Sequence, residues 1–313
     1  MNFLSLNIRG VGGAAKPRWV KSLVVSNKIG FLAIQETQLS DSSKIDLRRF
    51  WKGGGMESDF VNAVGRSGGL LCIWNSGIFG ASKVVKDRNF LLISGMLIGN
   101  KKHLNIMNVY APQEVALKKI LWTQIRRLIL ETDGYWVVMG DFKSVRVPEE
   151  RLNSQFDSNC ATEFNNFILE TGLQEFSMKG AKFTYCQKQG RKLSKIDRIL
   201  VSLNYLDDWS DSCCMVLKRS LSDHSPVILK SSFLDYGPRP FRVFNSWFDK
   251  EDFDWILMEA VSSFNGSGNP AKRLHDKLKH IKECIKCWAK KTRKKKRRSL
   301  KLQKMNWRYL MTC

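Results

Sequence analysis

Short polar motifs recur at the ends of apolar runs, and this arrangement constrains the fold more than any other feature of the chain. Asn7, Glu36 and Asp141 each follow an apolar run, whereas the pair Asp223 and His224 comes just before one. A sheet brings the ends of distant strands to a common rim, so polar residues far apart in sequence can gather at one edge. We therefore expect these residues to lie together.

The apolar runs are short and numerous, which is typical of a sheet-rich fold. Strand character is expected over residues 3–8, 31–34, 68–74, 90–98, 103–109, 135–139, 183–186, 196–201, 214–217 and 227–230. Gly99-Asn100 predicts a hairpin turn, and helical spacing appears over 18–26, 115–131 and 161–170. Because the pattern is not a strict strand–helix repeat, we predict an α/β four-layer sandwich, with two packed mixed β-sheets flanked by helices.

Proline and glycine concentrate at 235–240 and again near 265–270, where linkers are expected. These breaks divide the chain into a domain over 1–235, a connector over 236–270 and a basic helical C-terminal extension over 271–313. Apolar residues recur at helical spacing in the extension: Leu274, Leu278, Ile281, Ile285 and Trp288. One side of this helix is therefore expected to pack against another element.

The formal net charge of +23 indicates an anionic partner. Residues 271–313 hold 17 Lys/Arg against Asp276 and Glu283, so the extension carries +15 of that charge. Its run 290–298 has eight basic residues in nine, which suits contact with DNA or RNA, or nuclear import. A solvated helix face that joined two domains explains the run equally well.

The chain has no apolar run of about 18 residues, and its N-terminus is too polar for a signal peptide, so no membrane contact is expected. The eight cysteines show no disulfide framework, which favours a reducing compartment. We expect synthesis in the cytoplasm and a nuclear location. Oligomeric state is left open by these patterns.

Clustered carboxylates with a histidine and amides are suited to phosphodiester hydrolysis. The reaction requires a metal ion that offsets phosphate charge, a base that orients the nucleophile and a donor for the developing negative charge. Asp197 lies between apolar neighbours and needs a buried partner, which His224 could provide. Each residue alone is more typical of a turn, a cap or core packing; their joint order favours a site.

Six motifs together resemble the endonuclease/exonuclease/phosphatase superfamily. They are Asn7-Ile-Arg-Gly, Gln35-Glu-Thr, Val109-Tyr-Ala-Pro, Gly140-Asp-Phe, Ser194-Lys-Ile-Asp-Arg and Ser222-Asp-His-Ser-Pro. Within that superfamily the chain most resembles the apurinic-like endonuclease domain of plant non-LTR (LINE-type) retrotransposons. The segments 148–154, 180–185 and 237–247 add to this resemblance, which covers roughly residues 1–250.

The resemblance implies a Mg²⁺ site, with Mn²⁺ as an alternative ion, at one rim of the sandwich. Glu36 would bind the metal, assisted by Asn7 and Asp223. Asp197 would orient His224, which contacts the scissile phosphate or acts as a base.

The other implied roles concern the substrate. Asp141 would position the attacking water or protonate the leaving oxygen, and Tyr110 would contact the phosphate. Arg151, Thr184 and Ser194 match positions that touch the DNA backbone or shape the site. The expected reaction is nicking of double-stranded DNA, which leaves a 3′-hydroxyl that primes reverse transcription.

Lys143 departs from the family pattern, which has asparagine after Gly140-Asp-Phe. Lysine is cationic and only a donor; it could lower the basicity of Asp141, repel the metal or bind phosphate. Impaired cleavage is therefore expected, and a catalytically inactive nucleic-acid-binding remnant is the alternative. A phosphatase of the same superfamily is the third possibility. The chain also stops where a reverse transcriptase would follow, as expected of a truncated reading frame.

Overall fold

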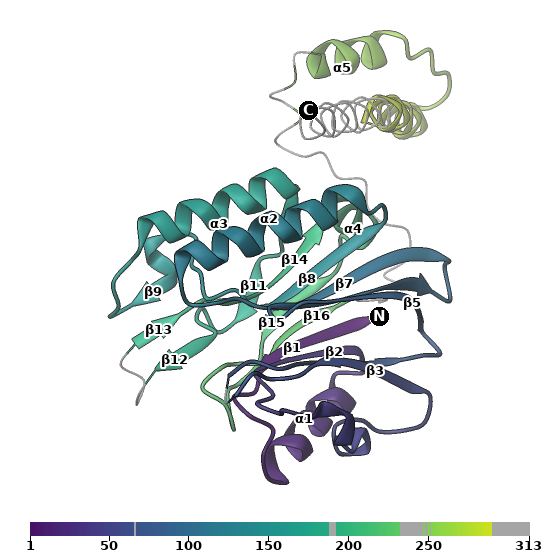
Figure 1. Ribbon diagram of the computed structural model, residues 1–313. Helices are drawn as coiled ribbons and strands as arrows, with labels where there is room; N and C mark the ends of the chain where they lie inside the picture. Colours follow the sequence, from purple (N-terminus) through teal and green to yellow (C-terminus); the bar gives the residue numbers. More distant parts are fainter. Residues whose placement is uncertain (66, 188–191, 232–246, 248–249, 251, 290–313) are drawn as a thin grey trace. The chain divides into compact units, whose positions relative to one another are not determined.

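The computed structural model describes residues 1–65, 67–187, 192–231, 247, 250 and 252–289 (Figure 1). The chain divides into two compact units, Met1–Phe233 and Leu234–Cys313, and each is described by itself. The predicted connector lies partly outside the described residues, and the basic run 290–298 lies wholly outside them.

One sheet of the first unit has seven strands and is built around two parallel neighbours, β1 and β2. In spatial order its strands are β11 (Met178–Gly180), β15 (Cys213–Val216), β16 (Val227–Lys230), β1 (Asn2–Asn7), β2 (Ile29–Gln35), β4 (Leu70–Asn75) and β3 (Met56–Val61). β16 runs antiparallel to β1. The carboxyl ends of β1 and β2 therefore share a rim with the residues that precede β16.

The second sheet has six strands and also contains one parallel pair, β7 and β8. Its order is β10 (Leu173–Glu175), β14 (Asp197–Ser202), β8 (Tyr135–Asp141), β7 (Lys102–Tyr110), β6 (Phe90–Leu97) and β5 (Phe79–Lys86). Asp141 has a register partner on each neighbouring strand. These are Asp197 on the antiparallel strand β14 and Tyr110 on the parallel strand β7. Three predicted site residues thus meet at one end of this sheet.

The two sheets pack face to face and each carries helices on its outer face (Figure 1). Buried residues of both inner faces form one core, in which Phe31 of the first sheet and Ile106 of the second take part. The first sheet is covered by α1 (Ala15–Ser26), with η1 (Ser42–Lys44) and η2 (Leu47–Arg49) nearby in the chain, and the second by α2 (Val115–Glu131) and α3 (Ser158–Thr171). The four-layer α/β sandwich is confirmed.

Local sequence explains the helices over the second sheet. In α2 the buried residues Leu121, Ile125 and Ile129 lie four apart, which places them on one face of the helix. Asp157 caps the start of α3 by accepting a hydrogen bond from the Cys160 backbone N–H at 3.0 Å. Gly172, with φ +66°, takes the left-handed conformation that closes it.

Smaller elements complete the first unit. η3 (Pro148–Glu150) leads into a three-stranded sheet in the order β12 (Tyr185–Gln187), β13 (Lys192–Ser194) and β9 (Arg151–Leu152), and α4 (Leu203–Asp208) follows β14. In the second unit, α5 (Phe253–Ser262) contacts a helical segment, 270–289, through Phe253, Ile285 and Trp288. Leu274 and Leu278 of that segment are exposed. Among the described residues, no helix is both long and apolar enough to cross a bilayer.

Several strand boundaries differ from the sequence prediction. The strand expected over 183–186 begins at Tyr185, because the chain bends at Thr184, whose Oγ1 accepts from the backbone N–H groups of Ile196 and Asp197. β3 and β5 were not predicted at all. Both are edge strands, and β5 carries exposed lysines where a central strand would be apolar, a pattern that protects an edge from further pairing.

Candidate active site

The structure brings the predicted polar residues to one rim of the first unit. Asn7 ends β1 and Glu36 follows β2, while Tyr110 ends β7 and Asp141 ends β8. Asp197 begins β14 directly opposite Asp141. The carboxyl ends of β1 and β2 in one sheet and of β7 and β8 in the other lie at this rim. Residues from both sheets therefore reach one cavity, as the sequence pattern indicates.

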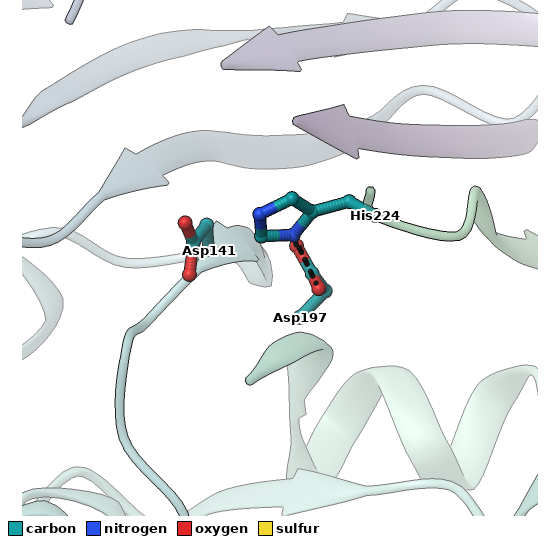
Figure 2. A group of neighbouring side chains, drawn as sticks. All are labelled: Asp141, Asp197 and His224. Carbon is teal, nitrogen blue, oxygen red and sulfur yellow. Dashed lines mark hydrogen bonds and ion pairs between the residues drawn. The ribbon is translucent and has the colours of Figure 1, made fainter. Parts of the chain in front are cut away.

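Asp197 and His224 form a buried pair. His224 Nδ1 lies 3.0 Å from Asp197 Oδ1 and 2.9 Å from Oδ2 (Figure 2). Burial lowers the pKa of His224, but the charge and hydrogen bond of Asp197 outweigh it and the pKa rises to about 9. The imidazole therefore holds its proton at neutral pH, with Nδ1 directed at Asp197.

Asp141 lies beside this pair, and the ligand atoms of Asp141, Asp197 and His224 are all within 4.8 Å of one another (Figure 2). Burial raises the pKa of Asp141 to about 6, since the opposing effects of His224 and Lys143 are smaller. A carboxyl group with this pKa can exchange a proton near neutral pH, which suits acid–base work.

The amide of Asn7 bridges two carboxylates from different sheets. Its Nδ2 donates to Glu36 Oε2 at 3.2 Å and to Asp141 Oδ2 at 3.0 Å, and its Oδ1 accepts from the Arg9 backbone N–H at 3.1 Å. Because one nitrogen donates to both, Glu36 Oε2 and Asp141 Oδ2 can be no farther apart than these two bond lengths added together. Glu36 and the group around His224 thus belong to a single site.

Glu36 is held by two further donors. The Tyr110 hydroxyl donates to Oε2 at 3.2 Å and Gln38 Nε2 donates to Oε1 at 3.0 Å. Burial, with the charges of Glu36 and Asp141, raises the pKa of Tyr110, so its phenol stays a donor. Glu36 has φ +57°, a conformation that non-glycine residues seldom adopt and that is often retained at functional sites.

Asp223 forms an ion pair with Arg9, whose guanidinium is otherwise largely exposed. Its other oxygen, Oδ1, is buried and has no hydrogen-bond partner in the described part of the chain. An unpartnered buried carboxylate oxygen is costly unless a donor or a cation meets it. Together with Glu36, this oxygen makes the rim a suitable set of ligands for a hard divalent cation, which prefers oxygen.

These residues line a cavity of about 400 Å³. Its wall comprises Asn7, Arg9, Glu36, Tyr110, Gln113, Asp141, Lys143, Arg151, Ser154, Tyr185, Gln187, Lys192, Ser194, Ile196, Asp223 and His224. A larger hollow of about 510 Å³, near Trp51, has no carboxylate or imidazole in its lining and cannot support the same chemistry.

Of the three residues predicted to contact DNA or shape the site, two line the cavity and one is fully buried. Arg151 on β9 and Ser194 on β13 are register partners and line the cavity. Thr184 is fully buried, and its Oγ1 accepts hydrogen bonds from the backbone N–H groups of Ile196 and Asp197 at 3.1 and 3.0 Å. Thr184 is therefore placed to shape the start of β14 rather than to meet a ligand.

Several cavity residues were not predicted. Arg9 stands inside the first motif, but its pairing with Asp223 depends on two segments 214 residues apart. Lys192 and Gln187 reach the wall through the small sheet, whose strands are too short to give a periodic pattern. For Arg9, the sequence offered one signal of a role in the site, namely its position directly after Asn7 and Ile8 in the first motif.

A largely buried ion cluster is built from residues next in the chain to residues of the site. Arg198 is fully buried and donates from Nη1 to both oxygens of Glu175, at 2.8 and 2.9 Å, and from Nη2 to Glu150. Lys195 joins the cluster through Glu175, with Nζ and Oε1 2.8 Å apart. Glu150 directly precedes Arg151 of the cavity wall, and Arg198 directly follows Asp197 on β14. The cluster therefore connects the cavity wall to the strand that carries Asp197, the partner of His224.

The model of a protein family described as endonuclease-reverse transcriptase matches residues 104–228. No curated protein matches the chain.

Solved structures show the same fold. An AP endonuclease from Leishmania major has a TM-score of 0.60 at 12% identity, over 73% of this chain and 86% of that one. The endonuclease domain of TRAS1, a telomere-specific non-LTR retrotransposon, has a TM-score of 0.52 at 13% identity, over 73% and 96%. A mannosyl-6-phosphatase from Bacteroides thetaiotaomicron has a TM-score of 0.52 at 13% identity, over 74% and 98%. The predicted resemblance to the endonuclease/exonuclease/phosphatase superfamily is confirmed. The structures that share the fold include both nucleases and a phosphatase.

Proposed function

We propose that this chain is a divalent-metal-dependent phosphodiesterase that nicks double-stranded DNA and leaves a 3′-hydroxyl, as a retrotransposon-type endonuclease would. The main support for this proposal is the Asn7 side chain, which bonds both Glu36 and Asp141. Asp141 in turn lies beside the Asp197–His224 pair. The match to the endonuclease-reverse transcriptase family supports this substrate class.

Glu36 and Asp223 are the residues proposed to hold the ion, with Asn7 fixing the orientation of Glu36. A bound Mg²⁺ or Mn²⁺ would offset the charge on the phosphate and stabilise the leaving oxygen. The buried group of Asp141, Asp197 and His224 also has metal-ligand spacing. It is the weaker candidate, because both oxygens of Asp197 are already within hydrogen-bond distance of His224 Nδ1.

The protonated His224 acts as a donor to a non-bridging phosphate oxygen, and Asp197 keeps the imidazole charged and oriented. Such a positioned charged donor stabilises the negative charge that grows in the transition state. Because its pKa is well above neutral, His224 is a poor base.

Asp141 is assigned to the attacking water. Its Oδ2 accepts from Asn7 and its Oδ1 from the Lys143 backbone N–H at 3.0 Å, so the carboxylate is held in one orientation. With a pKa of about 6 it is mostly ionised at neutral pH and can accept the proton of the water. Tyr110 is proposed to contact the phosphate from the neighbouring strand.

The basic wall is proposed to hold the DNA backbone. Arg9, Arg151 and Lys192 line the cavity, and such side chains contact phosphate without regard to sequence. A nuclear location and RNA contact through residues 290–298 remain predictions from sequence, since that run lies outside the described residues.

A second candidate function is DNA binding without cleavage. It is favoured by Lys143, whose ammonium stands in the cavity where the family pattern has a neutral amide. A phosphatase acting on small phosphomonoesters is the third candidate, because the fold is compatible with both substrate classes.

The test is a supercoiled-plasmid nicking assay in Mg²⁺, in Mn²⁺ and in EDTA. We expect metal-dependent nicks that a DNA polymerase can extend, and their loss in Glu36→Ala and His224→Ala. Glu163→Ala, which removes a half-buried carboxylate on α3 that pairs with Lys119, serves as the matched control. Salt-sensitive DNA binding without nicks would favour the second function, and rapid phosphate release from small phosphomonoesters would favour the third.

A further inference from the structure

The backbone of Lys143 is fixed on both sides. Its N–H donates to Asp141 Oδ1 at 3.0 Å, and its carbonyl accepts from the Lys118 ammonium at 2.7 Å. Lys118 is only 4% exposed and also lies 3.3 Å from Cys160 Sγ, so this anchor is itself held in place. The Lys143 side chain therefore starts from a held backbone, and it lines the cavity.

The ammonium of Lys143 lies 3.7 Å from the centroid of the Tyr110 ring. The hydroxyl of that tyrosine donates to Glu36 Oε2, so one aromatic side chain contacts both the ammonium and the proposed metal ligand, and the charges of Lys143 and Glu36 interact. Among the described residues this ammonium makes a cation–π contact and no ion pair. Burial lowers the pKa of Lys143, while the charges of Asp141 and Glu36 oppose that shift.

We propose that the Lys143 ammonium is a tethered cation of the active-site cavity, which weakens divalent-ion binding at Glu36 and holds a phosphate oxygen when no ion is bound. The inference rests on the metal site of the proposed function. A fixed positive charge near Glu36 and Asp141 repels an incoming ion, and the partial burial of Lys143 weakens the screening of that repulsion by solvent. The ammonium keeps N–H donors for a phosphate, since the ring face satisfies it only in part.

The inference predicts effects of opposite sign from one substitution. Lys143→Met removes the charge but keeps a long apolar side chain. In this variant we expect divalent ions to bind about tenfold more tightly or better. In EDTA we expect weaker duplex binding, with the number of counterions released falling by about one because one phosphate contact is lost.

The experiment uses the full chain and needs no cleavage. Mn²⁺ binding is followed by the electron paramagnetic resonance signal of the free ion, and duplex binding in EDTA by fluorescence anisotropy over a series of salt concentrations. Lys143→Asn should behave as Lys143→Met in the Mn²⁺ titration, whereas Lys143→Arg should keep the wild-type affinity within about threefold because its charge remains. Lys192→Met, which removes another cation of the same cavity from a different wall, should change Mn²⁺ affinity less than about threefold.

An unchanged Mn²⁺ affinity in Lys143→Met, or an equal rise in Lys192→Met, would overturn the inference. Undiminished duplex binding of Lys143→Met in EDTA would also overturn it. Glu36→Gln separates this outcome from a failure of the proposed function. If Glu36→Gln leaves Mn²⁺ binding intact, the ion is not held at Glu36 and the proposed metal site itself is wrong. Thermal unfolding of each variant by circular dichroism checks that the fold is retained.

Discussion

Asn7 donates to Asp141 at 3.0 Å across 134 residues of sequence, and this bond joins the two sheets at the active-site rim. The same nitrogen donates to Glu36. One neutral amide thus keeps two carboxylates at a fixed separation, which would otherwise be unfavourable because like charges repel. The geometry of the proposed metal ligand and that of the proposed base therefore depend on one side chain.

Asn7→Ala is expected to lower nicking about 10- to 100-fold, the usual effect of losing a group that orients metal ligands. Leaving two carboxylates without their donor should also cost about 1–3 kcal/mol of unfolding free energy. Asn105→Ala is the matched control, since Asn105 is another fully buried amide, hydrogen-bonded to the Asp133 carbonyl away from the rim. Urea unfolding and plasmid nicking measure the two effects; equal nicking by both variants would contradict the assigned role of Asn7.

The Asp197–His224 pair predicts a pH dependence of stability. The pKa of His224 is raised to about 9 in the folded chain, against an ordinary value of 6.5. Its contribution is therefore fully present below pH 6.5 and is lost as pH rises towards 9. Urea unfolding in EDTA should show this decline, and Asp197→Asn should flatten it. A decline of equal slope in Asp197→Asn and in the wild-type chain would show that another group is responsible.

The buried Arg198 predicts a stability difference between two ion pairs. Arg198→Met leaves Glu175 and Glu150 buried without their main cation, which should cost about 3–5 kcal/mol. Arg127→Met breaks an exposed pair with Glu131 on α2, and should cost less than about 1 kcal/mol. Chemical denaturation at pH 7 compares them. Similar values would mean that the Arg198 cluster contributes no more than a surface pair.

The same cluster predicts loss of stability in acid. Burial alone would raise the pKa of Glu175, but Arg198 and Lys195 outweigh it, so the pKa is lowered from its ordinary value of 4.5. The stabilisation is present above that value and is lost as pH falls through the lower, folded-state pKa. Glu175→Gln should flatten the stability profile in this acid range, as followed by thermal unfolding between pH 5 and 3. An unchanged acid slope would exclude Glu175 as its source.

Backbone conformation at Lys143 predicts a stabilising substitution. Lys143 has φ +47°, in the left-handed region that asparagine adopts more readily than lysine. Lys143→Asn should therefore raise the unfolding free energy, by about 0.5–1 kcal/mol from backbone strain alone. Lys101→Asn is the control for strain without a cavity, because Lys101 has φ +50° in the exposed turn between β6 and β7. Thermal unfolding compares them, and a loss of stability in Lys143→Asn would show that the cation–π contact outweighs the strain.

Local sequence determined much of the fold. The helix expected over 115–131 is α2, residue for residue, because its apolar positions repeat every three to four residues. The turn at Gly99-Asn100 joins β6 and β7 as expected. Periodicity reports which face of an element is buried, so it identifies central strands and covered helices. It is silent for edge strands such as β3 and β5, which have no need of an apolar pattern.

The sequence by itself determined which polar residues end the central strands, and hence which of them could share a rim. Apart from the expected pair of Asp197 with His224, only the tertiary structure decided how they pair. The Asn7 bridge, the ion pair of Arg9 with Asp223 and the burial of Arg198 each depend on the register and packing of segments far apart in the chain. Such contacts leave no local pattern, because their geometry exists only after segments far apart in the chain have come together.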